Sequence, residues 1–360
     1  MTDIRGTAII LSNGWLDNIH AKTTHGLLRG TSRFQVNALI DPRFAGKDPG
    51  EILDGVRRNI PIFATVDESL TALNPKPQYC IVGVAVHGGL IPETLRDSVV
   101  SAMRGGMSIV CGLHSLLQED PEFSRVAGEC GVRLIDVRKP KSANELRFWS
   151  GEIFNVKTPR IAVLGTDCAL GKRTTAKMLT DLCSANGIKS EMIYTGQTGW
   201  MQGYKHGFIF DSTINDFITG EIERVIVECE RESSPDVMFI EGQSSLRNPS
   251  GPCGSEFLKA GDVKGVILQH APARTHFDGL ADRAQGLLPT VESEIELIRI
   301  YGSETLAVAL NEEKWDDSQM RAYQNDLSKR IGIPVIRPLK DGLDALLPVI
   351  RKFIKAQQKC

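Results

Sequence analysis

The feature that most constrains the fold is an apolar run that ends in a glycine-rich turn and is followed by a helical pattern. The run covers residues 160–164 and is apolar apart from Arg160, and an almost entirely apolar run is typical of a strand buried on both faces of a sheet. The turn has the sequence Gly165-Thr-Asp-Cys-Ala-Leu-Gly171-Lys172, and apolar residues recur at helical spacing from Ala176 onward. A strand, a glycine-rich turn and a helix in this order are the setting of a phosphate-binding loop, or P-loop. The sequence therefore predicts an α/β domain with a parallel sheet in the second half of the chain.

The length of 360 residues predicts two domains, because single cores stop growing at roughly 250–300 residues. Short apolar runs alternate with helical patterns, which predicts βαβ units in two doubly wound α/β domains. The connector at 138–159 contains two prolines, and we place the boundary between domains 1–152 and 153–360. The predicted strands are 7–11, 34–40, 79–86, 108–112 and 132–137 in the first domain, and 160–164, 191–195, 237–240, 265–269, 306–310 and 334–337 in the second. Helices are predicted between them, among them one whose apolar stripe covers 214–229.

Composition excludes several functional classes. The 42 Lys and Arg against 44 Asp and Glu leave a net charge of -2, which gives no positive field for nucleic acid or anionic lipid. The apolar runs are far shorter than the roughly 20 residues that span a bilayer, and the N-terminus lacks the pattern of a signal peptide. The eight cysteines form no CxxC pair, which favours neither a zinc site nor a disulfide framework. We expect a cytoplasmic, metal-free protein with a small-molecule substrate, no nucleic-acid or membrane partner, and a homo-oligomeric state such as a dimer.

The phosphate loop has residues suited to binding an anion. Its glycines let backbone N–H groups converge on phosphate oxygens, and the helix N-terminus adds partial positive charge. Five residues separate the glycines where four are usual, and Arg173 replaces the hydroxyl that normally holds Mg²⁺. The pattern predicts a polyphosphate site without a metal, although Thr174 or Thr175 could supply a hydroxyl, and a tight turn without ligand is the alternative. The predicted cofactor-binding residues are Gly165, Thr166, Asp167, Cys168, Ala169, Leu170, Gly171, Lys172, Arg173 and Thr174.

A second acidic position follows a later strand. The apolar run at 237–240 ends in Glu241-Gly242, which is a Walker-B-like arrangement that places a carboxylate near the phosphate loop. Glu241 is therefore predicted to be a general base or to hold a metal-bound water. The alternative is an acid that caps the next turn. Together with Gly165-Thr-Asp and Thr195-Gly-Gln-Thr-Gly199, these residues make 160–250 similar to dethiobiotin synthetase and its relatives.

A second resemblance covers nearly the whole chain. The segments that carry it are Lys22-Thr-Thr-His-Gly-Leu-Leu-Arg29, Val86-His-Gly-Gly89, Gly112-Leu-His-Ser115, Asp136-Val-Arg-Lys-Pro140, the phosphate loop, and His270-Ala-Pro-Ala-Arg-Thr-His-Phe-Asp278-Gly. They resemble a family long described as conserved and of unknown function, whose characterised members are D-glutamate N-acetyltransferases. The resemblance implies a Rossmann-like N-terminal domain, a P-loop C-terminal domain, acetyl-CoA as co-substrate, and conversion of D-glutamate to N-acetyl-D-glutamate in D-amino acid catabolism. Coenzyme A carries a diphosphate, so Arg173 in place of a metal-binding hydroxyl agrees with this implication.

Acetyl transfer needs a base for the ammonium, oxyanion donors and cations for the substrate carboxylates. The candidate bases, in no fixed order, are Glu241, His270, His276 and Asp278. Arg274 is the first and Arg247 the second candidate for binding the carboxylates, because Arg forms paired hydrogen bonds with them. Each of these arginines and histidines could instead be a structural or surface residue.

The first half of the chain supplies further candidates. His87 and His114 each follow a predicted strand beside glycines, and with Arg29 they are predicted to bind substrate. Local packing and capping is the alternative. Cys168 could carry an acyl group, because a helix N-terminus lowers a thiol pKa, although direct transfer is preferred.

Two other functions remain open from the sequence. One is an ATP- and Mg²⁺-dependent kinase or ligase of the dethiobiotin synthetase type, which would use Glu241 and Asp167. The other is a nucleotide-sensing module without catalysis. Arg173 argues against the first of these, and the residues at 270–278 argue against the second.

Overall fold

The computed structural model describes residues 4–281 and 283–358, which form two compact units. Unit 1 comprises Met1–Pro140 and Gln197–Tyr204, and unit 2 comprises Lys141–Gly196 and Lys205–Cys360. The sequence predicted a domain boundary between residues 152 and 153, and in the structure the chain passes from unit 1 to unit 2 after Pro140. The segment Gln197–Tyr204 belongs to unit 1 although it lies within the second half of the chain, which a single boundary cannot express.

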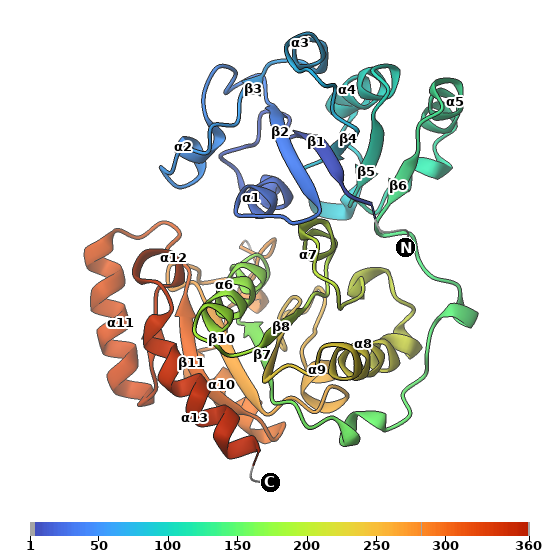
Figure 1. The fold of residues 1–360 in the computed structure, drawn as a ribbon. Coiled ribbons are helices and arrows are strands. Elements are labelled where there is room, and N and C mark those ends of the chain that lie inside the picture. The colour runs from blue at the N-terminus through green and yellow to red at the C-terminus, as the bar shows by residue number, and fades with distance from the viewer. Residues whose placement is uncertain (1–3, 282, 359–360) are drawn as a thin grey trace. The chain divides into compact units, whose positions relative to one another are not determined.

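Unit 1 is a parallel sheet of six strands in the order β3-β2-β1-β4-β5-β6 (Figure 1). This is the strand order of the Rossmann fold, so the predicted doubly wound class is confirmed. Its strands are β1 (Gly6–Leu11), β2 (Phe34–Ile40), β3 (Ile62–Phe63), β4 (Tyr79–Val82), β5 (Ser108–Cys111) and β6 (Leu134–Asp136). Its helices are α1 (Lys22–Leu28), α2 (Pro49–Leu53), α3 (Val66–Ala72), α4 (Glu93–Arg104), α5 (Pro121–Cys130) and α7 (Gln197–Gln202).

Besides shifts of one or two residues at other strand ends, two details of unit 1 differ from the prediction. The predicted strand at 79–86 ends at Val82, and a Cβ at the next residue, Gly83, would come within 2.1 Å of Thr24 Oγ1. The strand β3 was not predicted, since its two residues are too few to form a periodic pattern.

Unit 2 is also a parallel sheet of six strands, in the order β12-β11-β10-β7-β9-β8. The predicted strands are all present with shifts of one to two residues at their ends: β7 (Arg160–Gly165), β8 (Ser190–Ile193), β9 (Val237–Glu241), β10 (Gly265–His270), β11 (Glu304–Leu310) and β12 (Val335–Ile336). The helices are α6 (Lys172–Ala185), α8 (Ile218–Ser233), α9 (Ser255–Lys259), α10 (Val291–Ile300), α11 (Asp317–Ile331), α12 (Pro338–Asp341) and α13 (Leu347–Gln357). The helix predicted over 214–229 begins only at Ile218, because Ile214 is exposed and residues 215–217 form a separate 3₁₀ turn.

The central position of β7 explains where a ligand site forms in unit 2. β7 pairs with β10 on one side and with β9 on the other, and Val163 lies opposite Glu241 in that second pairing. The carboxyl ends of β7, β9 and β10 therefore meet at one edge of the sheet, which is where open α/β sheets bind ligands.

The helix α7 is held in unit 1 by polar contacts along its whole length. Thr198 Oγ1 lies 3.2 Å from Thr23 Oγ1, and Gln202 Nε2 donates to the carbonyls of Gly26 and Gly30. The Thr195–Gly199 motif, singled out from the sequence as a P-loop-domain feature, therefore begins in unit 2 and ends in unit 1.

None of the helices in the described ranges combines the length and the apolar character needed to cross a membrane.

Candidate functional site

The phosphate loop joins β7 to α6, a helix of 14 residues whose first turn has no side-chain cap. Gly171 occupies the N-cap position with a φ of 102°, and Ala169 has a φ of 52°. Both angles lie in the left-handed region, which lets the chain turn sharply into the helix. The N–H groups and the partial positive charge of a helix N-terminus are suited to an anion.

Lys172 folds back over this loop. Its ammonium donates to the carbonyl oxygen of Asp167 at 2.7 Å and to that of Ser244 at 2.8 Å, and the residue is buried. The contacts join the loop to the segment that follows β9. Thr175 Oγ1, one of the two hydroxyls considered as metal ligands, donates to Gln269 Oε1 at 2.8 Å.

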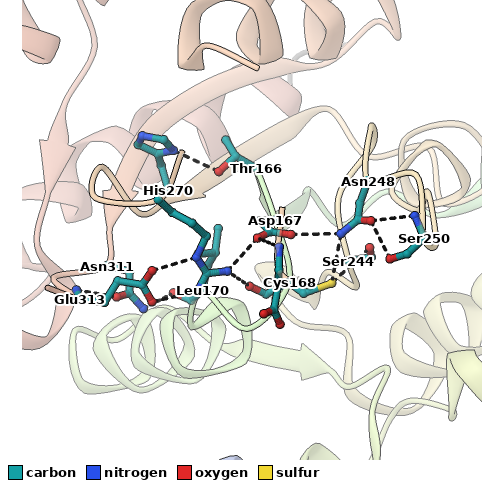
Figure 2. Close-up of polar contacts among 12 residues, drawn as sticks. Thr166, Asp167, Cys168, Leu170, Ser244, Asn248, Ser250, His270, Asn311 and Glu313 are labelled. Carbon is teal, nitrogen blue, oxygen red and sulfur yellow. Dashed lines mark hydrogen bonds and ion pairs between the residues drawn. The ribbon is translucent and has the colours of Figure 1, made fainter. Parts of the chain in front are cut away.

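Asp167 has a fully buried side chain with three hydrogen-bond donors around it (Figure 2). Oδ1 accepts from Asn248 Nδ2 at 3.0 Å, while Oδ2 accepts from Arg274 Nη1 and from the backbone N–H of Asp278, each at 2.8 Å. These donors come from the segments after β9 and β10. Asp167 therefore ties the phosphate loop to two neighbouring segments at the same sheet edge.

Arg274, the first candidate for binding substrate carboxylates, already bonds to two acids of the protein. Its Nε and Nη2 donate to the two oxygens of Glu313 at 2.8 Å each, and its Nη1 bonds to Asp167 and to the carbonyl of Cys168. The two carboxylates raise the pKa of the guanidinium against the opposing effect of burial, so Arg274 stays charged. These contacts favour a structural role over the predicted one.

Glu241 ends β9 directly beside the phosphate-loop strand. Its Oε2 accepts the backbone N–H of Thr195 at 3.0 Å, and its carbonyl accepts Thr195 Oγ1 at 2.7 Å. Burial raises the pKa of the Glu241 carboxyl, while Arg173 and Lys172 act in the opposite direction. A buried carboxyl group thus lies close to both cations of the loop, where an anionic ligand would add to its proton affinity.

His270 is the last residue of β10, where the sequence predicted a strand that ended at Gln269, and its Nδ1 lies 3.0 Å from Thr166 Oγ1 (Figure 2). Burial, assisted by Arg274, lowers the pKa of the imidazole to about 4. A group with so low a pKa accepts protons poorly at neutral pH, so His270 is a weak candidate for the base. His276 is half-buried beside Thr275 Oγ1, and Asp278 contacts the loop through its backbone N–H.

The remaining two candidates of unit 2 have structural partners. Arg247 donates to the buried Glu294 and to Ser293 on α10, at 2.7 and 2.8 Å. Cys168 is half-buried, with its Sγ 3.4 Å from Ser244 Oγ and 3.6 Å from Asn248 Nδ2.

The candidates of unit 1 lie on separate elements. His114 is exposed after β5, and its backbone N–H donates to Gly89 at 2.8 Å, so the segments after β4 and β5 meet at the carboxyl edge of that sheet. A Cβ at Gly89 would come within 2.3 Å of the His114 ring, so this approach requires glycine. His87 begins the 3₁₀ turn that contains Gly89, and Arg29 caps the carboxyl end of α1. Their roles in substrate binding stay predictions.

Three residues of the site were not found from the sequence: Asn248, Asn311 and Glu313. Asn311 and Glu313 follow β11 directly, so the rule that ligands bind at carboxyl strand ends could have found them. Asn248 lies in a long irregular segment without a sequence signal. Among the residues that the structure describes, no three His, Cys, Asp or Glu side chains form a group that could hold a metal ion.

Two family models match the chain. One, described as the P-loop domain DUF1611_C of unknown function, covers residues 147–347, and the other, described as the Rossmann-like domain DUF1611_N, covers 42–140.

Relatives with curated names and a solved structure agree with these matches. A protein of Tritonibacter scottomollicae named D-glutamate N-acetyltransferase is 29% identical over 279 residues, which are 75% of this chain and 80% of the relative. A protein of the same name from Pseudoalteromonas sp is 28% identical over 274 residues, 74% of this chain and 79% of the relative. The crystal structure of a DUF1611 family protein from Anabaena variabilis ATCC 29413 superposes with a TM-score of 0.86 at 27% identity, over 97% of this chain and 100% of that one.

Proposed function

Because this chain belongs to the DUF1611 family, we propose that it is an N-acetyltransferase that uses acetyl-CoA to acetylate the amine of an acidic amino acid, D-glutamate in particular. The names of the two curated relatives support the reaction and the acceptor, since each relative aligns with about three quarters of the chain.

The structural observation that carries the proposal is the phosphate loop with its two cations, Lys172 and Arg173. Arg173 occupies the position of the usual metal-binding hydroxyl, and Thr175 Oγ1 bonds to Gln269. The two oxygens of Asp167 accept three hydrogen bonds inside the protein. A diphosphate fits this loop, because Lys172, Arg173 and the start of α6 supply the positive charge that Mg²⁺ supplies elsewhere.

The same contacts weigh against an ATP-dependent kinase or ligase. Such an enzyme needs acidic oxygens and a hydroxyl that bind Mg²⁺ next to the phosphates. Asp167 would have to give up Arg274 and Asn248 to do this, which would leave a buried guanidinium short of an acceptor.

The proposal also assigns Glu241 to one end of the coenzyme. In acetyl transfer a base takes one proton from the ammonium, and the amine nitrogen attacks the thioester carbonyl. The C–S bond then breaks, and coenzyme A leaves as a thiol with a second proton from the nitrogen. The arm between the diphosphate and the thioester is as long as roughly four extended residues, about 14 Å. If the loop binds the diphosphate, Glu241 lies at that end of the coenzyme, so we assign it to coenzyme binding and not to proton transfer.

The experiment is a product assay of the purified full chain in EDTA. It is incubated with acetyl-CoA and, separately, with both enantiomers of glutamate and aspartate, and the N-acetyl product is measured by mass spectrometry together with thiol release. We expect product with D-glutamate and equimolar thiol. Product from none of the four acceptors would overturn the proposal, and ADP release from ATP and Mg²⁺ would favour the kinase or ligase.

A further inference from the structure

We infer that Arg274 is a positioning residue that, with Asp167, holds the phosphate loop in its anion-binding shape, and that it does not bind the acceptor. This inference rests on the proposed function for its ligand, the diphosphate of coenzyme A. It is carried by the contacts of the loop carbonyls and by the charges around Arg274.

The first step concerns the middle of the loop, between β7 and α6. Three carbonyl oxygens there accept hydrogen bonds from side chains: that of Asp167 from Lys172, that of Cys168 from Arg274, and that of Leu170 from Asn311. These donors lie 2.7–3.1 Å from the oxygens. The peptide bonds of the loop are trans, so each carbonyl points away from the N–H of the next residue.

Fixing those carbonyls therefore fixes the direction of the N–H groups that follow them, at residues 168, 169 and 171. It also keeps three carbonyl oxygens, whose partial negative charge repels phosphate, bonded to donors of the protein. The left-handed φ of Ala169, between the two carbonyls held by Arg274 and Asn311, costs energy in an L-residue and needs such support.

The second step concerns charge. Arg274 contacts Asp167 and Glu313, so the group carries one positive and two negative charges. A substrate carboxylate that bound Arg274 would have to displace Glu313 from a paired interaction. The network suits a guanidinium that holds protein segments together, and it does not suit an acceptor site for a dicarboxylate.

The third step concerns the reach of the network. Asp167 and Arg274 together contact the segments after β7, β9, β10 and β11 through Cys168, Asn248, Asp278 and Glu313. Arg274 is the member that bonds to the loop backbone, to Asp167 and to Glu313 at once. Its loss is therefore expected to loosen the loop more than the loss of a comparable arginine elsewhere.

Arg224 on α8 offers the matched control. It bonds to Glu221 at 2.9 and 2.8 Å and to Glu228 at 2.6 Å, and its side chain is 14% exposed where that of Arg274 is 10% exposed. The two arginines thus have the same kind of partners and similar burial. In the contacts above, Arg224 bonds only to residues of its own helix, and Arg274 bonds to the loop.

The test measures binding of coenzyme A, and of inorganic pyrophosphate as the smaller probe, by titration calorimetry. We expect Arg274→Gln to weaken binding of both anions about tenfold or more, because the Cys168 carbonyl of the loop loses its charged donor. Arg224→Gln should leave both affinities within about twofold of the wild type. The single variant Asp167→Asn and the double variant Arg274→Gln/Asp167→Asn are measured in the same way. The double variant should bind the anions no more weakly than the weaker-binding of the two single variants, because the two residues act as one unit.

Kinetics separate this role from acceptor binding. Arg274→Gln should raise the KM for acetyl-CoA and leave the KM for D-glutamate within about twofold. Unchanged anion binding with a raised acceptor KM would overturn the inference. If circular dichroism shows that Arg274→Gln does not fold, Arg274→Lys is measured in its place, because one ammonium cannot bond to Cys168, Asp167 and Glu313 together. Anion affinity equal to that of the wild type in Arg274→Lys would overturn the inference.

The two proposals can fail separately. A wild type that binds pyrophosphate and not coenzyme A would overturn the proposed function, and the pyrophosphate data would then decide the role of Arg274. A wild type that binds neither anion would overturn both.

Discussion

Thr166 Oγ1 lies 3.0 Å from Nδ1 of His270, and this contact joins the start of the phosphate loop to the end of β10. Both residues are buried. The imidazole is therefore part of the packing beneath the loop, and burial rather than a nearby acid determines its titration.

The low pKa of His270 makes the stability of the protein depend on pH. The folded-state pKa is about 4, and an unfolded histidine titrates near 6.5. Between these values the unfolded chain binds a proton that the folded protein does not, so folding loses stability as the pH falls through this window. The loss amounts to about 2 kcal/mol by about pH 5. Urea unfolding at about pH 7 and 5 should show a smaller loss in His270→Asn, and an equal loss in both proteins would contradict the assignment.

The raised pKa of Glu241 predicts the opposite dependence. The pKa of Glu241 is higher in the folded than in the unfolded protein. The carboxyl therefore contributes to the stability of the folded state, fully at a pH below its unfolded pKa, and this contribution is lost as the pH rises through its folded pKa. Glu241→Gln removes this titration and keeps an oxygen that can accept the Thr195 N–H. The variant should gain stability relative to the wild type as the pH rises. A variant that becomes relatively less stable toward neutral pH would refute the prediction.

The same substitution tests what Glu241 does in the reaction. Its assignment to the diphosphate end predicts a changed KM for acetyl-CoA in Glu241→Gln, with the pH profile of kcat kept in shape. Loss of the acidic limb of that profile, measured with D-glutamate at saturating acetyl-CoA, would identify Glu241 as the base instead.

Gly242 is predicted to tolerate no side chain. A Cβ there would lie 2.3 Å from the carbonyl oxygen of Val163 on β7, and backbone cannot move aside cheaply. Gly242→Ala should therefore destabilise the protein by about 1–3 kcal/mol. Gly251→Ala is the control, since that position is exposed and open, and its effect should stay within about 0.5 kcal/mol. Equal melting temperatures of the two variants would mean that the strands around Gly242 can adjust.

Cys168 is predicted to be dispensable for the chemistry. Its Sγ contacts Ser244 and Asn248, which suits a small residue that fills space in the loop. Cys168→Ser should retain most of the activity, and mass spectrometry of the quenched enzyme should show no acetylated cysteine. An acetyl group trapped on Cys168 would establish a two-step transfer.

Most of the fold was predictable from the sequence because the signals for its strands and for the loop are local. Apolar runs followed by turns located eleven strands, and the glycine spacing located the loop before α6. The partners of Arg274 were not predictable, because Asp167 and Glu313 lie far from it along the chain and meet it only through the order of the strands. A charged residue in a motif can bind a substrate or an internal acid, and spacing alone does not distinguish the two.

The most direct test of the central claim is the affinity of acetyl-CoA for the wild type and for Lys172→Ala, measured in EDTA. Lys177→Ala is the control on the same helix, since Lys177 pairs with Asp181. We predict metal-independent binding that weakens about tenfold or more in Lys172→Ala, the size expected for one lost charged hydrogen bond, and that stays near the wild-type value in Lys177→Ala. Binding that requires Mg²⁺, or that is equal in the wild type and Lys172→Ala, would contradict the account.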